Sequence, residues 1–505
     1  MTVKNIVSVT MEIALRGSAN YAGGLGVLEA DKFYVAARTG LPYIVIAPFY
    51  PRGYVEYDID PGGKLIEVTH RHSSEFLSRL RFVKTVVARG GNGRFLAEAD
   101  VYEYREGSAR ALLYYVKRPR AVAKLFDYLY RYGDGGECQS FILASAIAAE
   151  IIKKVTGGSD SYVDVQEAHL GLVPYLIPKT YTVRFVTHTP GPWGHPLLCE
   201  GETEEVLDIS LPSVRTMSEA IMEVASEIFA VSRRHAEITK SLFPKYAGKV
   251  RYVTNAVDLG FWKRVERDIG SPQELSVERA KLKEELTSLI AGLTGKKVNN
   301  RILLVWARRI TKYKRPFFVE RLVEEIDFRD RIFIMVAGKP HRNDVWGIRQ
   351  AERLHHLSQE VENLAFYPSY SIELARYLLS GADVLLFTPF PGWEACGTSY
   401  MKSGVNGVPS IASRDGGALE MIEDGVNGWL FGSELKEFVN LDDERAKKIN
   451  EHDYEDLVKK LEKVLDLIEN KKEEFELVAY RAYRSFREVA DMKRMLSQYY
   501  PEFFR

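Results

Sequence analysis

The chain has 505 residues, too many for one hydrophobic core of ordinary size, so we expect two domains. Lysine and arginine total 69 and aspartate and glutamate total 69, and this balance gives no reason to expect nucleic acid or an acidic membrane as a partner. Any site for an anion must therefore be local.

The cysteines are Cys138, Cys199 and Cys396, an odd number without metal-ligand spacing. They predict neither a disulfide framework nor a zinc module, and they favour a reducing compartment. The sequence has no run of about 18 apolar residues and no secretory apolar segment at its start. We therefore expect a cytoplasmic protein that binds no metal and does not enter a membrane.

Short apolar runs alternate with amphipathic stretches in the first half, which is typical of parallel sheets with crossover helices. Strands are predicted at 6–9, 43–47, 162–165, 184–187, 228–231 and 250–253. Between about 54 and 116 the pattern changes to alternating residues and glycine turns, which predicts an antiparallel insertion. These elements predict a first domain over 1–262.

Residues 263–300 are charged, helix-prone and without a strand, so we interpret them as a connector that opens the second domain. Strands are then predicted at 302–306, 332–337, 364–367, 384–387, 409–412 and 429–431. They predict a doubly wound domain over 263–485, followed by a C-terminal helix over 486–505 that returns to the first domain. Ligands of such sheets bind beyond the carboxyl ends of the strands.

A basic loop at 308–316 follows directly after the strand at 302–306. Its five cations are Arg308, Arg309, Lys312, Lys314 and Arg315. Guanidinium and ammonium groups bind phosphate oxygens by charge-assisted hydrogen bonds. A solvated basic loop is the alternative, but the position at the carboxyl end of a strand favours an anion site.

A glycine-rich loop at 21–28, with the sequence Tyr-Ala-Gly-Gly-Leu-Gly-Val-Leu, lies between the first strand and the first helix. Glycine lets a backbone approach a ligand closely. The loop lacks the Lys-Ser/Thr pair of a P-loop and the G-x-G-x-x-G pattern of dinucleotide folds, so a plain tight turn is an equally good interpretation.

The segment 390–402 follows the strand at 384–387. Gly397, Thr398 and Ser399 have the pattern of a helix N-terminus that offers amides and hydroxyls to an anion, and Lys402 lies just over one turn further on. A phosphate and an amine in this arrangement suit a phosphorylated aldehyde held by the lysine. From spacing alone, a lysine on the helix surface is the more frequent case.

Two histidines, His169 and His188, lie at predicted strand ends in the first domain. A structural role and a role in a ligand site are equally good interpretations for them.

Together these motifs resemble, in order along the chain, those of the α-glucan (glycogen or maltodextrin) phosphorylase family, in a short form. The resemblance runs through 11–12, 21–26, 166–169, 187–190, 253–255, 307–315, 337–339, 394–402, 406–407 and 415–416. It implies an α/β chain with two facing Rossmann-like domains of the GT-B type and an active site in the cleft between them. It also implies phosphorolysis of α-1,4-glucan to glucose 1-phosphate with retention, pyridoxal 5'-phosphate as cofactor, and possible homo-oligomers.

The resemblance implies a role for each motif. Lys402 would carry the cofactor, whose phosphate would be held by Gly397, Thr398, Ser399, Arg308 and Lys314. The substrates would be bound by Gly24, Leu25, Gly26, His169, His188, Asn255, Arg309, Lys314 and Glu394. Within this set the main-chain carbonyl of His188 would face the anomeric carbon, and Glu394 and Asn255 would contact sugar hydroxyls.

Two other functions stay open. A glycogen or starch synthase that uses a nucleotide sugar shares the architecture, but enzymes of that kind carry a second glutamate eight residues after the first, where this chain has Lys402. A glucan-binding protein without activity is the other alternative, although the residues Arg309, Lys314, Glu394 and Lys402 are all present.

Overall fold

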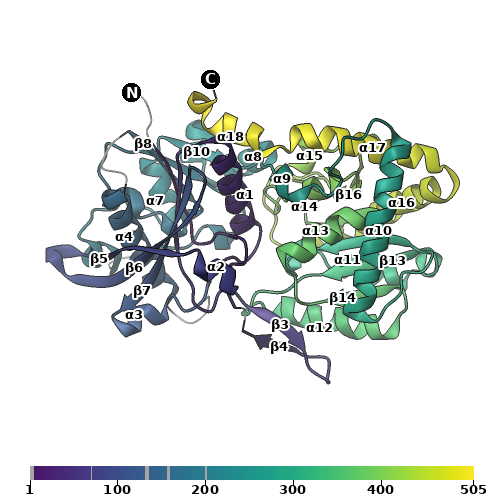
Figure 1. The fold of residues 1–505 in the computed structure, drawn as a ribbon, viewed down its shortest axis with the longest axis horizontal. Helices are drawn as coiled ribbons and strands as arrows, with labels where there is room; N and C mark the ends of the chain where they lie inside the picture. Colours follow the sequence, from purple (N-terminus) through teal and green to yellow (C-terminus); the bar gives the residue numbers. More distant parts are fainter. Residues whose placement is uncertain (1–4, 70, 131–135, 156–159, 199–201, 505) are drawn as a thin grey trace. The chain divides into compact units, whose positions relative to one another are not determined.

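The computed structural model describes residues 5–69, 71–130, 136–155, 160–198 and 202–504 (Figure 1). The chain divides into two compact units. Unit 1 comprises Met1–Val55, Thr69–Thr254 and Leu496–Arg505, and unit 2 comprises Glu56–Val68 and Asn255–Met495. Both units are built on sheets with parallel strands, which confirms the predicted α/β class.

Unit 1 contains a nine-stranded sheet in the order β11-β10-β9-β8-β1-β2-β7-β6-β5. Its strands are β1 (Asn5–Val9), β2 (Tyr43–Pro48), β5 (Arg81–Arg89), β6 (Phe95–Glu106), β7 (Ala109–Arg118), β8 (Ser161–Gln166), β9 (Thr182–Val186), β10 (Glu227–Ala230) and β11 (Val250–Tyr252). All neighbours pair in parallel except β5 with β6 and β6 with β7. The strand order changes direction between β1 and β8, the kind of position where such sheets bind ligands.

The helices of unit 1 include α1 (Gly24–Thr39), which is buried along most of its length and follows β1. The others are α2 (Ser74–Ser78), α3 (Arg120–Lys124), α4 (Glu137–Val155), α5 (Val173–Leu176), α6 (Glu202–Leu207), α7 (Met217–Val224) and α8 (Arg233–Leu242). The last turns of the chain also belong to this unit, because Tyr500 is buried against Tyr43 and Tyr162 of the sheet.

Unit 2 contains a six-stranded parallel sheet in the order β14-β13-β12-β15-β16-β17. The strands are β12 (Ile302–Ala307), β13 (Ile332–Ala337), β14 (Leu364–Tyr367), β15 (Val384–Phe387), β16 (Ser410–Ser413) and β17 (Trp429–Phe431). Numbered along the chain, this is the order 3-2-1-4-5-6 of a doubly wound dinucleotide-binding sheet. Its direction changes between β12 and β15, so the loops after these two strands are the expected ligand site.

The helices of unit 2 flank this sheet, and β12 to β17 share an apolar core with α11, α12, α16 and α17. The helices are α9 (Leu259–Trp262), α10 (Pro272–Thr294), α11 (Phe317–Glu324), α12 (Val345–Glu360), α13 (Ile372–Gly381), α14 (Ser399–Gly404), α15 (Ala418–Met421), α16 (Glu444–Asn470) and α17 (Lys472–Val489). The helix α18 (Met492–Tyr499) follows α17.

A separate antiparallel hairpin, β3 (Glu56–Ile59) and β4 (Leu65–Val68), belongs to unit 2 although unit 1 precedes and follows it in the chain. It lies beside α12 (Figure 1), and the Leu65 amide donates to Oε1 of Glu352 at 3.2 Å. Nζ of Lys339 also pairs with the buried Glu56 carboxylate. The stretch 54–116 is therefore divided between this hairpin and the strands β5 to β7.

The cysteines differ from the expectation of a fully reduced set, since Cys138 in α4 is disulfide-bonded. Cys396 is free and buried. An odd number of cysteines gives no spacing from which a pair can be identified, so the sequence did not indicate this bond.

Candidate functional site

In unit 2, the loops after β12 and β15 meet through an ion pair between Arg308 and Glu394. Nη2 of Arg308 donates to Oε2 of Glu394 at 2.6 Å, and Nζ of Lys314 lies 3.8 Å from the same oxygen. Burial raises the pKa of Glu394, but Lys314 and Arg308 outweigh it and the net pKa is below the usual range. Glu394 therefore stays ionised between these cations.

Lys314 has an unusual protonation equilibrium. Burial lowers the pKa of its ammonium to about 7, and the charges of Arg308 and Arg309 act in the same direction while Glu394 opposes them. The cations Arg308, Arg309 and Lys314 are thus close enough to repel one another, and one carboxylate does not compensate them. A site with this excess of positive charge is suited to an anion.

The Arg308 guanidinium has donors to spare. It is only 6% exposed, and its Nε and Nη1 atoms have no hydrogen-bond partner among the described residues. Its Cζ lies 4.0 Å from the centre of the Phe387 ring, a cation–π contact. Buried donors in native proteins are nearly always satisfied, so these two atoms are available to an acceptor outside the chain, such as a ligand or a water molecule.

The other two cations of the basic loop do not face this site, which corrects the interpretation of all five as one phosphate cluster. Arg315 is buried and donates to the main-chain oxygens of Thr388 and Pro389, each at 2.8 Å, and to the Asp453 carboxylate at 2.7 Å. Lys312 pairs with Asp442 in a more exposed position. Arg315 thus has a structural role, which the charge pattern alone does not reveal.

Lys402 lies in α14, the short helix that begins at Ser399 after Thr398, as the sequence predicted. Its amide donates to the Thr398 oxygen at 3.0 Å. The side chain is 7% exposed and its Nζ lies 4.0 Å from the centre of the Trp262 ring. The interpretation as a surface lysine is therefore wrong.

Gly397 allows the backbone before α14 to lie against β15. A Cβ atom at this position would be 2.4 Å from Cζ of Phe387, so any other residue would move the chain. Asn255 lies beside the same segment, because its Nδ2 donates to the Cys396 oxygen at 3.1 Å. The structure thus brings Asn255 together with the segment that carries Glu394, Gly397, Thr398, Ser399 and Lys402.

Two residues that support this segment had no role assigned from the sequence. Asp415 follows β16, and its Oδ2 accepts the Glu394 amide at 2.8 Å. Burial raises the pKa of Asp415 to about 7. Trp262 lies in another part of the sequence from Lys402, so only the fold shows that its ring covers the amine. The motif at 415–416 included Asp415 without assigning it a role, and no local pattern pointed to Trp262.

In unit 1, the glycine-rich loop is held by Glu12, which follows β1. Its Oε2 accepts the Ala22 amide at 2.6 Å, and its Oε1 accepts the Tyr130 hydroxyl at 3.0 Å. A Cβ on Gly26 would lie 2.6 Å from Oε2 of Glu12, whereas a Cβ on Gly24 would meet nothing within 4 Å. The first turn of α1, with Gly24, Leu25 and Gly26, therefore has free space at Gly24 and no capping side chain.

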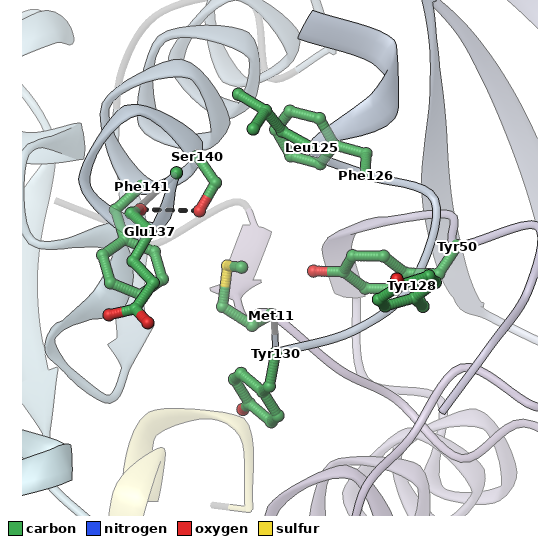
Figure 2. Close-up of a pocket in the computed structure, with 10 residues that line it drawn as sticks. Met11, Tyr50, Leu125, Phe126, Tyr128, Tyr130, Glu137, Ser140 and Phe141 are labelled. Atoms are coloured by element: carbon green, nitrogen blue, oxygen red, sulfur yellow. Dashed lines mark hydrogen bonds between the residues drawn. The ribbon is translucent and has the colours of Figure 1, made fainter. Parts of the chain in front are cut away.

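His169 is buried between the rings of Tyr130 and Phe141, with ring centres at 5.6 and 4.9 Å. Burial lowers its pKa to about 4, so the ring is neutral. Tyr130 and Phe141 also line a pocket of about 50 Å³ with a largely aromatic lining (Figure 2). The lining residues include Met11, Tyr50, Phe126, Tyr128, Tyr130, Glu137 and Phe141.

His188, after β9, is tied to the end of β8. Its Nε2 lies 2.8 Å from Oε1 of Gln166, whose Nε2 donates to Oγ of Ser8 at 3.1 Å. Burial lowers the pKa of His188 well below its usual value. The imidazole is therefore neutral and tied to Gln166.

Comparison with known proteins supports the resemblance. The phosphorylase family, described as carbohydrate phosphorylase, matches residues 355–499. The maltodextrin phosphorylase of Thermococcus litoralis is 25% identical over 86% of this chain and 63% of its own length. The glycogen phosphorylase of Aquifex aeolicus is 26% identical over 82% of this chain and 73% of its own length. An uncharacterized protein of Methanocaldococcus jannaschii is 26% identical, with 79% and 82% covered.

The chain thus spans less than two thirds of the length of that maltodextrin phosphorylase. Within the described part of the chain, no helix is both long and apolar enough to cross a membrane, and no group of three potential ligand side chains could hold a metal ion. The matches confirm the resemblance that the motifs indicated: the chain is similar to proteins named glycogen phosphorylase and maltodextrin phosphorylase, and its residues 355–499 match the carbohydrate phosphorylase family.

Proposed function

We propose that this protein is an α-glucan phosphorylase, which cleaves α-1,4-glucan with inorganic phosphate and releases glucose 1-phosphate with retention. The observation that carries this proposal is the group formed by Arg308, Lys314 and Glu394, in which buried guanidinium donors lack a partner among the described residues. Such a group suits phosphoryl oxygens. The names of the related enzymes support the same activity.

The residues around Lys402 fit pyridoxal 5'-phosphate. The amine is buried, the segment before α14 passes so close to Phe387 that position 397 has no room for a side chain, and Arg308 has two donors to spare. We infer that Lys402 holds the cofactor and that Gly397, Thr398, Ser399, Arg308 and Lys314 hold its phosphate. When bound, the cofactor supplies a second phosphoryl group that can exchange a proton with inorganic phosphate.

The substrate phosphate would be bound by Arg309, Lys314 and the Gly24 amide. Two phosphoryl groups in one site repel each other unless cations surround them. Because the pKa of Lys314 is about 7, the arrival of an anion would draw a proton onto its amine and strengthen the site. The chain thus contributes to proton transfer through the positive charge that Lys314 gains when an anion binds.

The sugar would lie against the remaining predicted residues. The Glu394 carboxylate would accept hydrogen bonds from the sugar hydroxyls, and the Asn255 amide would donate to them or accept from them. The His188 carbonyl would face the anomeric carbon. Leu25, Gly26 and His169 complete this set. We propose glucan and phosphate as the substrates, with no nucleic acid or membrane as a partner. A cytoplasmic location and a homo-oligomer stay predictions.

A single assay separates this function from its alternatives. The purified protein, supplied with pyridoxal 5'-phosphate, maltoheptaose and phosphate, should release glucose 1-phosphate. A synthase would instead extend the glucan from a nucleotide sugar, and a binding protein would do neither. Elongation from UDP-glucose without phosphorolysis would contradict the proposal.

Lys402 can be tested in the same preparation. Borohydride reduction followed by peptide mass analysis should mark Lys402, and Lys402→Ala should abolish both the label and the activity. The matched control is Lys436→Ala, since Lys436 is an exposed lysine of the same unit. A label on any other lysine would remove Lys402 from the site.

A further inference from the structure

Glu167, directly after β8, has a backbone conformation that residues other than glycine hardly adopt. Its φ is 62° and its ψ is 164°. A side chain in this region costs conformational energy and persists only where its surroundings hold it there. Glu167 is also 2% exposed, so a buried carboxyl group accompanies the strained backbone.

The contacts of Glu167 explain what holds it. Its amide donates to the Val186 oxygen at 2.9 Å, which continues the pairing of β8 with β9. Its Oε1 accepts the His188 amide at 3.0 Å, and the Thr189 side chain interacts with the same carboxyl group. The carboxyl therefore contacts both residues that flank one peptide group, the one that contains the His188 carbonyl oxygen.

The neighbouring residue strengthens this connection. Gln166, which precedes Glu167, lies 2.8 Å from Nε2 of His188 through its Oε1. The end of β8 thus holds the side chain of His188 through Gln166 and, through Glu167, the His188 amide and the Thr189 side chain, which lie on either side of the His188 carbonyl. A glycine at 167 would adopt this backbone conformation without strain, but it has no carboxyl group to contact His188 and Thr189.

We propose that Glu167 is a positioning residue, whose carboxyl group fixes the orientation of the His188–Thr189 peptide and so aims the His188 carbonyl oxygen at the substrate. The role of that carbonyl rests on the proposed function. The fixed peptide itself is a property of unit 1. Burial raises the pKa of Glu167 to about 8, so near neutrality the group can hold the peptide without adding a negative charge.

The closing experiment compares Glu167→Gly with Glu167→Gln. Glycine removes both the strain and the carboxyl group, whereas glutamine keeps an oxygen that can accept the His188 amide. Glu167→Gly should lower kcat by roughly ten- to a hundredfold, because a small misplacement of a reacting group has effects of that size. It should leave the KM for phosphate within about twofold and should not lower the Tm, because glycine relieves the strain. Glu167→Gln should recover most of kcat.

The matched control is Asn92→Gly, which also replaces a residue of positive φ, 54°, in an exposed turn of unit 1. It should leave kcat and KM unchanged. A role in folding alone predicts the opposite pattern for Glu167→Gly, a lower Tm with an unchanged kcat per folded molecule, and that result would overturn the proposal.

Hydrogen exchange separates this inference from the proposed function. The amides of His188 and Thr189 should exchange faster in Glu167→Gly than in the unmodified protein and in Asn92→Gly. If the unmodified protein shows no phosphorolysis, the proposed function fails while this comparison still tests the fixed peptide. Unchanged exchange at 188–189 would refute the positioning role whatever the activity.

Discussion

Arg184 and Asp164 face each other across β9 and β8 through two hydrogen bonds of 2.7 Å, with both side chains almost fully buried. Arg184 also donates to the Tyr499 oxygen at 2.8 Å, and the Tyr500 hydroxyl donates to Oδ2 of Asp164 at 2.5 Å. This group therefore attaches the C-terminal residues to the sheet of unit 1.

Replacement of Arg184 by leucine should destabilise unit 1 by about 3–5 kcal/mol, because it leaves the Asp164 carboxylate buried without its cation. The free energy of unfolding can be measured by denaturant titration. The control is Arg251→Leu, whose partner Glu227 lies at 3.2 Å in an exposed pair, where we expect a change of at most about 1 kcal/mol. Equal losses of unfolding free energy in the two variants would show that the buried Arg184–Asp164 pair stabilises the unit no more than an exposed pair does.

The protonation of Lys314 should make anion binding depend on pH. Below pH 7 the amine carries its charge, and above pH 7 it loses it, so the affinity for sulfate should fall as the pH rises from 6 to 9. Sulfate is the appropriate probe because its own charge does not change in this range. Titration calorimetry should also detect proton uptake on binding above pH 7.

The variant Lys314→Met should bind sulfate more weakly and without this pH dependence. Lys312→Met serves as the control, because Lys312 belongs to the same loop but pairs with Asp442. A pH dependence that survives in Lys314→Met would assign the titration to another group.

The buried histidines of unit 1 should make the protein sensitive to acid. Burial lowers the pKa of His195 to about 4 and that of His235 to about 3. Between pH 6.5 and 4 the unfolded chain binds a proton at each such residue while the folded chain does not, so each lowers the free energy of unfolding by up to about 1.4 kcal/mol per pH unit.

His235→Asn isolates one of these contributions. Buried acids with raised pKa values, such as Glu167 and Asp415, act in the opposite direction but are present in both proteins. The variant should be less stable than the unmodified protein at pH 7.5, and the difference should shrink as the pH falls from 6.5 to 4. A difference that stays constant with pH would mean that His235 titrates alike in the folded and unfolded states.

Arg309→Ala should raise the KM for phosphate at least about tenfold or abolish turnover, because it removes a forked donor from the proposed anion site. Initial rates of glucose 1-phosphate release at several phosphate concentrations measure this. Arg329→Ala, an exposed arginine of the same unit, is the control. Unchanged phosphate kinetics in Arg309→Ala would exclude that residue from the site.

The sequence was most informative for the fully buried parallel strands, which are continuous apolar runs. The strands β13, β14, β15 and β17 match their predicted bounds residue for residue, since each is a short apolar run between polar turns. The helix start at Thr398 and Ser399 was predicted for a similar local reason. The sequence could not show that the hairpin β3–β4 packs on α12, because no local pattern encodes its partner.

The side-chain environments were harder to predict than the elements. Lys402 lies buried under Trp262, and Arg315 binds main-chain oxygens, although a lysine on a short helix and an arginine in a basic loop both suggest solvent. Their surroundings come from residues more than 70 positions away, so the charge pattern of a single segment cannot distinguish a buried lysine or arginine from a solvated one.

The hydrogen bonds from Arg315 to the oxygens of Thr388 and Pro389 join the basic loop to the start of the segment that leads to Glu394. A ligand that orders one of these loops should therefore also order the other. Two ligands that contact different loops then lose the conformational entropy of the loops only once. Binding of the first ligand should raise the affinity for the second. Arg315 would create this thermodynamic linkage without contacting either ligand.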